Sequence, residues 1–425
     1  MNSLLDGRVR RALVLVLLVT VLSAPSEWPT DASTASTTLA LVGGTIYTSP
    51  HVAPIFDGAV VIAEGKVVAV GPRKEVEIPA GAQTLECRGL VVTAGFQNSH
   101  VHFTEEKWND DARQAPGKLG AQLAQMLTRY GFTTVVDTAS PLENTAALRR
   151  RIEAGEVAGP RILTAGDGIY PPNGIPFYLK EGPGKLPDEV LGRLSQPASP
   201  EEATEVARQR IGGGADLIKL FTGSWVARGK VLPMPEEIAS AAAEESHRQG
   251  KLVFSHPSNL AGLEVALRAN VDVLAHAIED TRGMTAEHIR RMREQGMALI
   301  PTLALFARDR YLFDILDEVR DYARSGGLIL FGTDVGYLTD YDPSMEYALM
   351  ESAGLGWREI LASLTTQPAA RFGEASRRGR IDRGMDADLV VLARDPVIDV
   401  RAFADVCYTL RAGKVIYSAA AGAPE

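Results

Sequence analysis

Short apolar runs recur through the middle of this 425-residue chain, and most of the gaps between them carry helical patterns. Eight such runs extend over about 250 residues, which is the usual size of a (β/α)8 barrel. Strands buried on both faces read as continuous apolar runs, and strands that alternate with helices pair in parallel. The sequence therefore predicts an α/β fold with a (β/α)8 TIM barrel, built on the runs at 90–96, 133–139, 161–166, 216–222, 251–256, 271–277, 297–303 and 328–334.

Both ends of the chain show the pattern of a small β domain. Residues 39–90 contain short β-rich runs with a hairpin turn expected at 64–65, and residues 380–420 repeat this pattern around 412–413. Glycine in a two-residue connection is typical of a hairpin. We therefore expect a β-sandwich domain assembled from both ends of the chain, with the barrel domain over 91–379.

One gap between the predicted strands differs from the others. Residues 167–199 are rich in Pro and Gly, including the stretch GIYPPNGIPFYLKEGPGKLPDE. Long connections of this kind usually carry function rather than regular structure. We expect an active-site loop here instead of a helix.

The first 24 residues are typical of a secretory signal peptide. Three arginines precede an apolar run over 12–24, whose 13 residues are fewer than the roughly 20 needed to cross a bilayer. Retention of this run as a membrane anchor is the alternative. Residues 25–38, rich in Pro, Ser, Thr and Ala, are expected to form a flexible tether. We therefore expect export to the periplasm or the extracellular space, without stable membrane insertion after cleavage.

Charge and cysteine content restrict the partners. The formal net charge is −9, and loss of residues 1–24, which contain one Asp and three Arg, would make it −11. A chain this acidic is poorly suited to bind nucleic acid. The two cysteines, Cys87 and Cys407, would either pair in an exported protein or remain ordinary thiols.

Residues that can bind metal ions stand at the ends of five predicted strands. In a barrel of this kind the carboxyl ends of the strands meet on one face, where the chemistry is located. The lysine among these residues lies inside the apolar stretch LIKLF, where an unpaired ammonium is costly, so it must lower its pKa, find a partner or be modified. The sequence therefore predicts one metal site formed by His100, His102, Lys219, His256, His276 and Asp334.

The other three histidines have a different setting. His51 lies in a turn-rich stretch, and His247 and His288 fall in charged helical patterns. We expect all three side chains to face solvent.

The predicted ligands, in this order and on these strands, resemble the pattern of the amidohydrolase superfamily. Its members join a split β-sandwich to a (β/α)8 barrel, with HxH on the first strand, Lys or Glu on the fourth, His on the fifth and sixth, and Asp on the eighth. The stretch IKLFTGS is most similar to the prolidase and imidazolonepropionase-related branch. The fifth strand departs from this pattern, because SHPSNLAG stands where relatives often have His, two residues and Gly.

This resemblance implies metal-dependent hydrolysis of an amide-type C–N bond. A water bound between two divalent ions, zinc by default, would lose a proton near neutral pH and attack the carbonyl. Asp334 would act first as general base and then as general acid. The implied ligands are His100, His102 and Asp334 for one ion, His256 and His276 for the other, and a carboxylated Lys219 bridging both.

The substrate pocket is expected to be formed by the loops that follow the strands. An aromatic wall and a cation after the fourth strand could receive an apolar side chain and a carboxylate, which favours a dipeptide or an N-acyl amino acid. The expected partner is thus a small molecule, and the resemblance is compatible with a homo-oligomer. The candidate substrate contacts are Tyr170, Trp225, Arg228 and Tyr337.

Three alternatives stay open. Many deaminases of the superfamily place an acid three residues after the fifth-strand histidine, where this chain has Asn259, so ring-opening hydrolysis at a mononuclear site is the closer alternative. A hydrolase of aromatic amides or carbamates would show the same pattern. A non-catalytic scaffold typically lacks some of the ligands, whereas this sequence retains all six.

Overall fold

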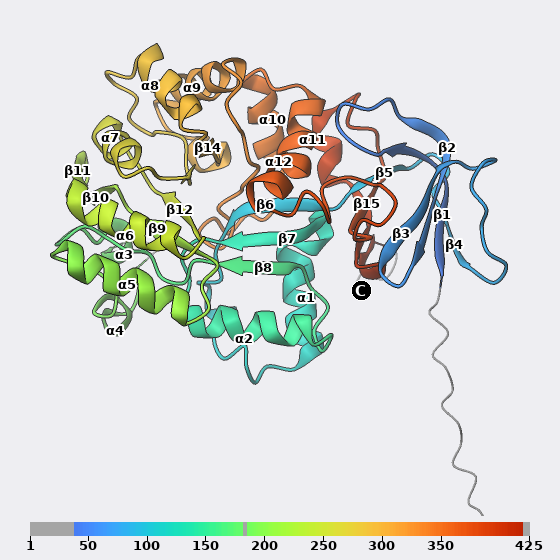
Figure 1. Cartoon of the computed structure of the whole chain (residues 1–425), viewed down its shortest axis with the longest axis horizontal. Coiled ribbons are helices and arrows are strands. Elements are labelled where there is room, and N and C mark those ends of the chain that lie inside the picture. Colours follow the sequence, from blue (N-terminus) through green and yellow to red (C-terminus); the bar gives the residue numbers. More distant parts are fainter. Residues whose placement is uncertain (1–37, 182–184, 420–425) are drawn as a thin grey trace, which may run out of the picture. The chain divides into compact units, whose positions relative to one another are not determined.

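The structure, a computed structural model, describes residues 38–181 and 185–419. The predicted signal peptide and all of the predicted tether except Thr38 lie outside these ranges. None of the helices within them is long and apolar enough to span a membrane. The chain is a mixed α/β protein (Figure 1).

Strands from both ends of the chain pair in one eight-stranded sheet, drawn in blue and red in Figure 1. The order is β17-β16-β15-β5-β1-β2-β3, with β4 paired to β1. Glu64 and Gly65 adopt φ of 53° and 73°, and Ala412 and Gly413 adopt φ of 48° and 74°, so both expected hairpin turns are confirmed. The strands are β1 (Leu39–Tyr47), β2 (Ile55–Ala63), β3 (Lys66–Pro72), β4 (Gln83–Glu86), β5 (Val91–Ala94), β15 (Leu389–Leu392), β16 (Val406–Arg411) and β17 (Lys414–Ser418).

Two further sheets are parallel and carry the central segment. One has the order β6-β7-β8 and the other β14-β13-β12-β9. Isolated parallel bridges extend their edges: Ile169 pairs with Leu220, Leu299 with Ile329, and Val101 with Val335. The strands are β6 (Phe96–Val101), β7 (Phe132–Asp137), β8 (Arg161–Thr164), β9 (Leu217–Leu220), β12 (Leu252–Ser255), β13 (Val273–Leu274) and β14 (Ala298–Leu299).

Two of the eight predicted runs differ from simple barrel strands. The first run divides at Gly95, because β5 pairs with β1 and β15 in the sheet of the chain ends, whereas β6 pairs with β7. The eighth run, at 328–334, forms no named strand. Isolated bridges and backbone hydrogen bonds, such as that from Ser99 N to Phe331 O at 2.7 Å, join it to its neighbours.

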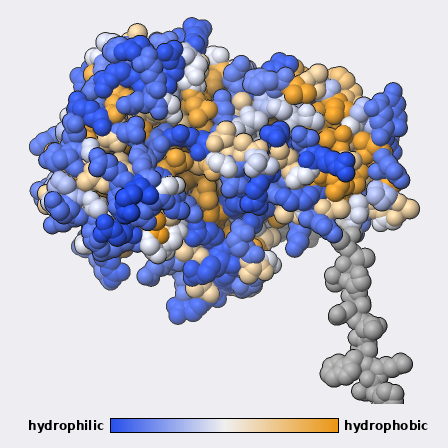
Figure 2. Space-filling model, viewed as in Figure 1, coloured by the Kyte–Doolittle hydropathy of each residue, from blue (hydrophilic) through white to orange (hydrophobic). Residues whose placement is uncertain are grey.

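Helices follow most of the parallel strands. Their outer faces, for example α8 and α9, are mainly hydrophilic in the view of Figure 2, while apolar side chains at helical spacing, such as Ile315, Val319 and Tyr322 of α9, are buried. The helices are α1 (Pro116–Met126), α2 (Leu142–Glu153), α3 (Phe177–Lys180), α4 (Asp188–Leu191), α5 (Pro200–Gly212), α6 (Glu236–Arg248), α7 (Leu260–Arg268), α8 (Ala286–Glu294), α9 (Leu312–Arg324), α10 (Ser344–Ser352), α11 (Trp357–Leu364) and α12 (Thr366–Arg371).

The predicted loop at 167–199 is confirmed in its main feature. Within its described residues, 167–181 and 185–199, the helices are α3 and α4, each of four residues. Ser199 ends the loop as the N-cap of α5, and its side chain accepts a hydrogen bond from Glu202 N. The loop therefore leads from β8 across the carboxyl ends of the strands to α5.

Along the parallel strands, residues two apart point to the same face, and this spacing places core residues and residues of the polar site one after the other on that face. Leu217 and Phe254 are buried in one apolar cluster, and Lys219 and His256 follow each of them by two residues on the same face. The strands thus supply a packed apolar layer, and polar side chains follow this layer toward the carboxyl ends of the strands.

Cys87 and Cys407 both pack in the apolar cluster of the chain-end sheet. Both are free thiols, so the alternative of two ordinary thiols holds.

Candidate metal centre

Three ligand atoms converge where β6 ends. His102 Nε2 lies 2.8 Å from Asp334 Oδ1, and His100 Nε2 lies 3.2 Å from the same oxygen. The two Nε2 atoms are 3.2 Å apart. Atoms that share an ion at about 2.0–2.1 Å are themselves separated by roughly 3 Å, so this triangle fits a divalent cation.

The burial of this triangle supports the same interpretation. The side chains of His100 and Asp334 are 0% and 4% exposed. Asp334 Oδ1 receives no well-aligned hydrogen bond although both imidazoles are near. A buried carboxylate oxygen in that position requires a positive charge to stabilise it.

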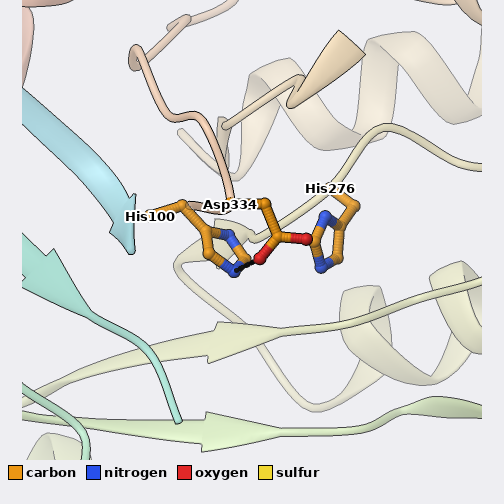
Figure 3. A group of neighbouring side chains, drawn as sticks. All are labelled: His100, His276 and Asp334. Carbon is orange, nitrogen blue, oxygen red and sulfur yellow. Dashed lines mark ion pairs between the residues drawn. The ribbon is translucent and has the colours of Figure 1, made fainter. Parts of the chain in front are cut away.

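A third histidine approaches the same carboxylate. One ligand atom each from His100, His276 and Asp334 lies within 4.8 Å of the others. The Asp334 carboxylate lies between the two imidazoles (Figure 3). The residues that could hold an ion therefore come from β6, from the end of the sixth run and from the end of the eighth.

Glycines on both sides of Asp334 permit this close approach. Asp334 itself has a φ of 59°, and its backbone N donates to His100 O at 2.9 Å. A Cβ on Gly336 would lie 1.9 Å from His102 O, and one on Gly332 would lie 2.8 Å from His100 Cβ. The segment can therefore lie against β6 only because both positions lack a side chain.

His256 and His276 extend the cluster away from β6. Their ring centroids are 4.6 Å apart, and the same distance separates His276 from His100. His276 Nδ1 is 2.8 Å from Thr302 Oγ1, which leaves Nε2 for an ion. The Thr302 segment is in turn held by Glu346, which accepts hydrogen bonds from Leu303 N and Ala304 N.

The electrostatics of these side chains follow from their burial. Burial lowers the pKa of His100 to about 4 and holds the pKa of His256 and His276 well below the ordinary value, so these imidazoles stay neutral and able to bind metal. Burial alone would raise the pKa of Asp334, but the adjacent imidazoles hold it well below the ordinary value. The site therefore presents neutral nitrogens and an ionised oxygen.

Lys219 lies on β9 and is 2% exposed. Burial lowers its pKa to about 7, and the Asp334 carboxylate only partly offsets this shift. A charged Lys219 ammonium would lower the pKa of both His100 and His256. Lys219 therefore lies close enough to these histidines to act on them electrostatically. At neutral pH a large share of the Lys219 amine is therefore uncharged and nucleophilic.

The centre opens into a cavity of about 1100 Å³. The six predicted ligands and the four candidate substrate contacts all line it, so the structure brings these ten residues together around one cavity. Their individual roles remain predictions. These ten residues are His100, His102, Lys219, His256, His276, Asp334, Tyr170, Trp225, Arg228 and Tyr337.

The four candidate substrate contacts have different settings. Tyr170 is buried and stacks on Phe221 at 4.4 Å, so it supports the wall. Trp225, on the hairpin of β10 (Gly223–Ala227) and β11 (Lys230–Pro233), donates its indole N–H to Glu279. The other two are exposed at the rim: Arg228 lies over the ring of Phe177, and Tyr337 packs against Tyr178.

Tyr178 and Glu279 are two of the lining residues that the sequence analysis did not predict. Tyr178 lies in the Pro- and Gly-rich loop, and Glu279 follows His276 by three residues. Only Glu279 had a local signal, because it is an acidic residue just beyond a predicted strand end. Asn259, at the position where deaminases carry an acid, instead caps α7 by accepting a hydrogen bond from Gly262 N at 3.1 Å.

The expectation for the remaining histidines was right for one of three. His51 is exposed. His247 and His288 are half-buried, because His247 Nε2 contacts Asp272 Oδ2 at 2.7 Å and His288 forms a capping box with Thr285. Neither is among the residues that line the cavity of the metal centre.

Comparisons with known proteins agree with this geometry. Residues 91–421 match the Amidohydrolase family. The ochratoxinase of Aspergillus niger is 24% identical over 417 residues, covering 85% of this chain and 83% of the relative. The imidazolonepropionase of Anaeromyxobacter sp. (strain K) is 26% identical over 383 residues, covering 80% and 86%. The crystal structure of a putative prolidase from Bifidobacterium longum superposes with a TM-score of 0.74 at 25% identity, covering 89% of this chain and 94% of that chain.

The site and these likenesses define the class as a hydrolytic enzyme that acts on C–N bonds. The chain belongs to the amidohydrolase family. The resemblance expected from the strand-end residues is confirmed.

Proposed function

We propose that this chain is a metal-dependent hydrolase that cleaves the amide-type C–N bond of a dipeptide or an N-acyl amino acid. The observation that carries the proposal is the triangle of His100 Nε2, His102 Nε2 and Asp334 Oδ1, with sides of 2.8 to 3.2 Å, at the floor of a large cavity. The names of the prolidase and ochratoxinase relatives agree with a small amide substrate.

The proposed ions are two zinc ions. His100, His102 and Asp334 would hold one of them, and His256 and His276 the other. Lys219, carboxylated on Nζ, would contribute an oxygen to each, and its lowered pKa supports this because only the neutral amine takes up CO2. When bound, such ions lower the pKa of water and polarise a carbonyl oxygen.

The residues of the chain then have separate tasks. Asp334, ionised and buried, accepts the proton of the attacking water and delivers it to the leaving nitrogen. His276 is held in position by Thr302 for its role as a ligand. The exposed Arg228 guanidinium at the rim is suited to bind a substrate carboxylate.

We also propose that the two parallel sheets belong to one closed (β/α)8 barrel over 91–379, with the chain-end sheet as a β-sandwich domain over 39–90 and 380–420. The three isolated bridges support closure, because they link β8 to β9, β14 to the eighth run, and the eighth run to β6. Removal of residues 1–24 and export of the mature chain remain part of the proposal, supported by the arginines and apolar run of that segment.

A ring-opening cyclic amidohydrolase with one ion is the second candidate. The 26% identity to an imidazolonepropionase favours it. At the position where many deaminases carry an acid, this chain has Asn259, which caps α7. This difference weakens the second candidate only for reactions that need an acid at that position. Aromatic amides and carbamates form a third group of substrates that the same cavity could accept.

The experiment that tests the proposal is a hydrolysis screen of the purified protein. Dipeptides, N-acyl amino acids, cyclic amides, lactones and carbamates are assayed with added zinc and, in parallel, with a chelator. Zinc-dependent release of amino acids from the first two groups is the expected result. Turnover confined to cyclic amides would favour the second candidate, and absence of any C–N bond hydrolysis would contradict the proposal.

A further inference from the structure

A carboxylate in the cavity wall has no cationic partner. Glu279 lines the cavity and is half-buried. Its Oε2 accepts a hydrogen bond of 2.7 Å from Trp225 Nε1. Within the ranges 38–181 and 185–419, no Lys, Arg or His nitrogen lies within 4.0 Å of it. Among the described residues, the hydrogen-bond donor to the Glu279 carboxylate is thus the neutral indole N–H of Trp225.

The neighbours of Glu279 increase this negative potential. Asp309 and Asp280 lie close enough to disfavour its ionisation. The nearby guanidiniums act on Asp280 instead: Arg282 Nη2 is 2.5 Å from Asp280 Oδ2, and Arg310 also lowers the pKa of Asp280. Arg282 is thus paired with Asp280 rather than with Glu279.

Burial and these acids together raise the pKa of Glu279 to about 7. A carboxylate that is partly removed from water without a counter-charge is destabilised, and a cation that enters the cavity would relieve this cost. The side chain of Trp225 fixes the direction of the carboxylate through its N–H.

We propose that Glu279, held by Trp225, is a recognition subsite for a positively charged nitrogen of the substrate, an ammonium or a guanidinium. This inference rests on the proposed function, since it takes the cavity to be the substrate site. It narrows the substrate class to amides that carry a cationic group. That group is either a basic side chain or the free α-amine of a dipeptide.

The test uses binding rather than turnover, so that it is independent of the hydrolysis screen. Isothermal titration calorimetry of the zinc-loaded protein compares two matched pairs of ligands. L-arginine against L-citrulline tests a basic side chain, and L-phenylalaninamide against its N-acetyl form tests an α-ammonium. The variants are Glu279→Gln, which keeps an acceptor for Trp225 Nε1, and Glu287→Gln, a control that removes an exposed carboxylate on α8.

The expected result is at least tenfold tighter binding of the cationic member of one pair. This preference should fall to less than threefold in Glu279→Gln and persist in Glu287→Gln. The pair that shows it identifies the source of the cation. Equal affinities in both pairs, binding of none of the four ligands, or a preference that survives in Glu279→Gln would overturn the inference, even if amides are hydrolysed.

If Glu279→Gln does not fold, the ligand preference of the wild-type protein is compared with that of a second variant, Trp225→Phe. This variant keeps the Glu279 carboxylate and removes its hydrogen-bond donor. The cationic preference should then decrease but remain measurable. A complete absence of preference in the wild-type protein, together with turnover of N-acyl amino acids that have no basic side chain, would leave the proposed function intact and contradict this subsite.

Discussion

His102 Nε2 lies 2.8 Å from Asp334 Oδ1, although His102 follows the first parallel strand and Asp334 ends the last apolar run. The contact closes the site from two distant parts of the sequence. It depends on the left-handed backbone of Asp334 and on glycines at 332 and 336. The proposed proton transfer and the proposed metal binding therefore both depend on the local backbone geometry at this one position.

Substitution Asp334→Asn should abolish the proton transfer while preserving the fold. Asn tolerates a φ of 59° and has nearly the same shape. We expect turnover to fall by about 10²–10⁴-fold, the usual contribution of general acid–base catalysis, with most of the metal retained. Steady-state kinetics and metal analysis of the variant measure both effects. Near-normal turnover would exclude the proposed proton shuttle.

Substitution Lys219→Ala should lower the metal content of the protein. Loss of the carboxylated side chain removes an oxygen ligand from both proposed ions, and short carboxylic acids such as propionate should partly restore activity. The control is Lys414→Ala, which removes an exposed lysine of β17. Full metal content and full activity of Lys219→Ala without added acid would rule out a bridging role.

Substitution Gly336→Ala should damage the site more than its backbone strain alone predicts. The new Cβ would lie 1.9 Å from His102 O, so the segment must move away from β6. Gly373→Ala is a matched control, because its φ of 72° imposes similar strain, about 1–2 kcal/mol, with no atom within 4 Å of the new Cβ. Chemical denaturation and metal analysis should show a larger loss of both stability and metal for Gly336→Ala. Equal effects in the two variants would contradict the close packing of this segment.

Glu318 should make the protein less stable at high pH. Its side chain is 5% exposed, and burial raises its pKa to about 8. Because the folded pKa exceeds that of the unfolded chain, near 4.3, the folded state binds the proton more tightly, and the free energy of unfolding falls as the pH rises between these values. Glu318→Gln keeps the hydrogen bond from Ile278 N and should remove on the order of 2–4 kcal/mol of this decrease.

The measurement is urea denaturation between pH 5 and pH 9 for wild-type protein, Glu318→Gln and the exposed control Glu359→Gln. A pH profile for Glu318→Gln that parallels that of the wild-type protein would show that Glu318 is ionised without cost.

The position of residues in the sequence indicated which side chains line the cavity better than it indicated how regular each strand is. Residues at the carboxyl ends of parallel strands meet whatever their distance along the chain, so the residues that line the cavity, including His256 and Lys219, could be found by position alone. The eighth run could not be predicted as irregular, because its apolar residues resemble those of a strand. Gly332 and the positive φ of Asp334 interrupt the regular pairing there.

Contacts between loops were beyond sequence analysis. The hydrogen bond from Trp225 to Glu279 depends on how the β10–β11 hairpin packs against the segment after β13. No periodic pattern specifies such a contact. The contact of His247 with Asp272 was missed for a different reason, because residues in a charged helical pattern are usually exposed.

The proposed metal centre is tested most directly by the metal stoichiometry of the purified protein. Inductively coupled plasma mass spectrometry of wild-type protein, equilibrated with zinc and then freed of unbound ions, should find two ions per chain, with a marked decrease in His276→Ala. Removal of the ions by a chelator should stop amide hydrolysis, and zinc should restore it. A wild-type protein that holds no divalent ion, or one that hydrolyses amides equally well without it, would contradict the metal centre.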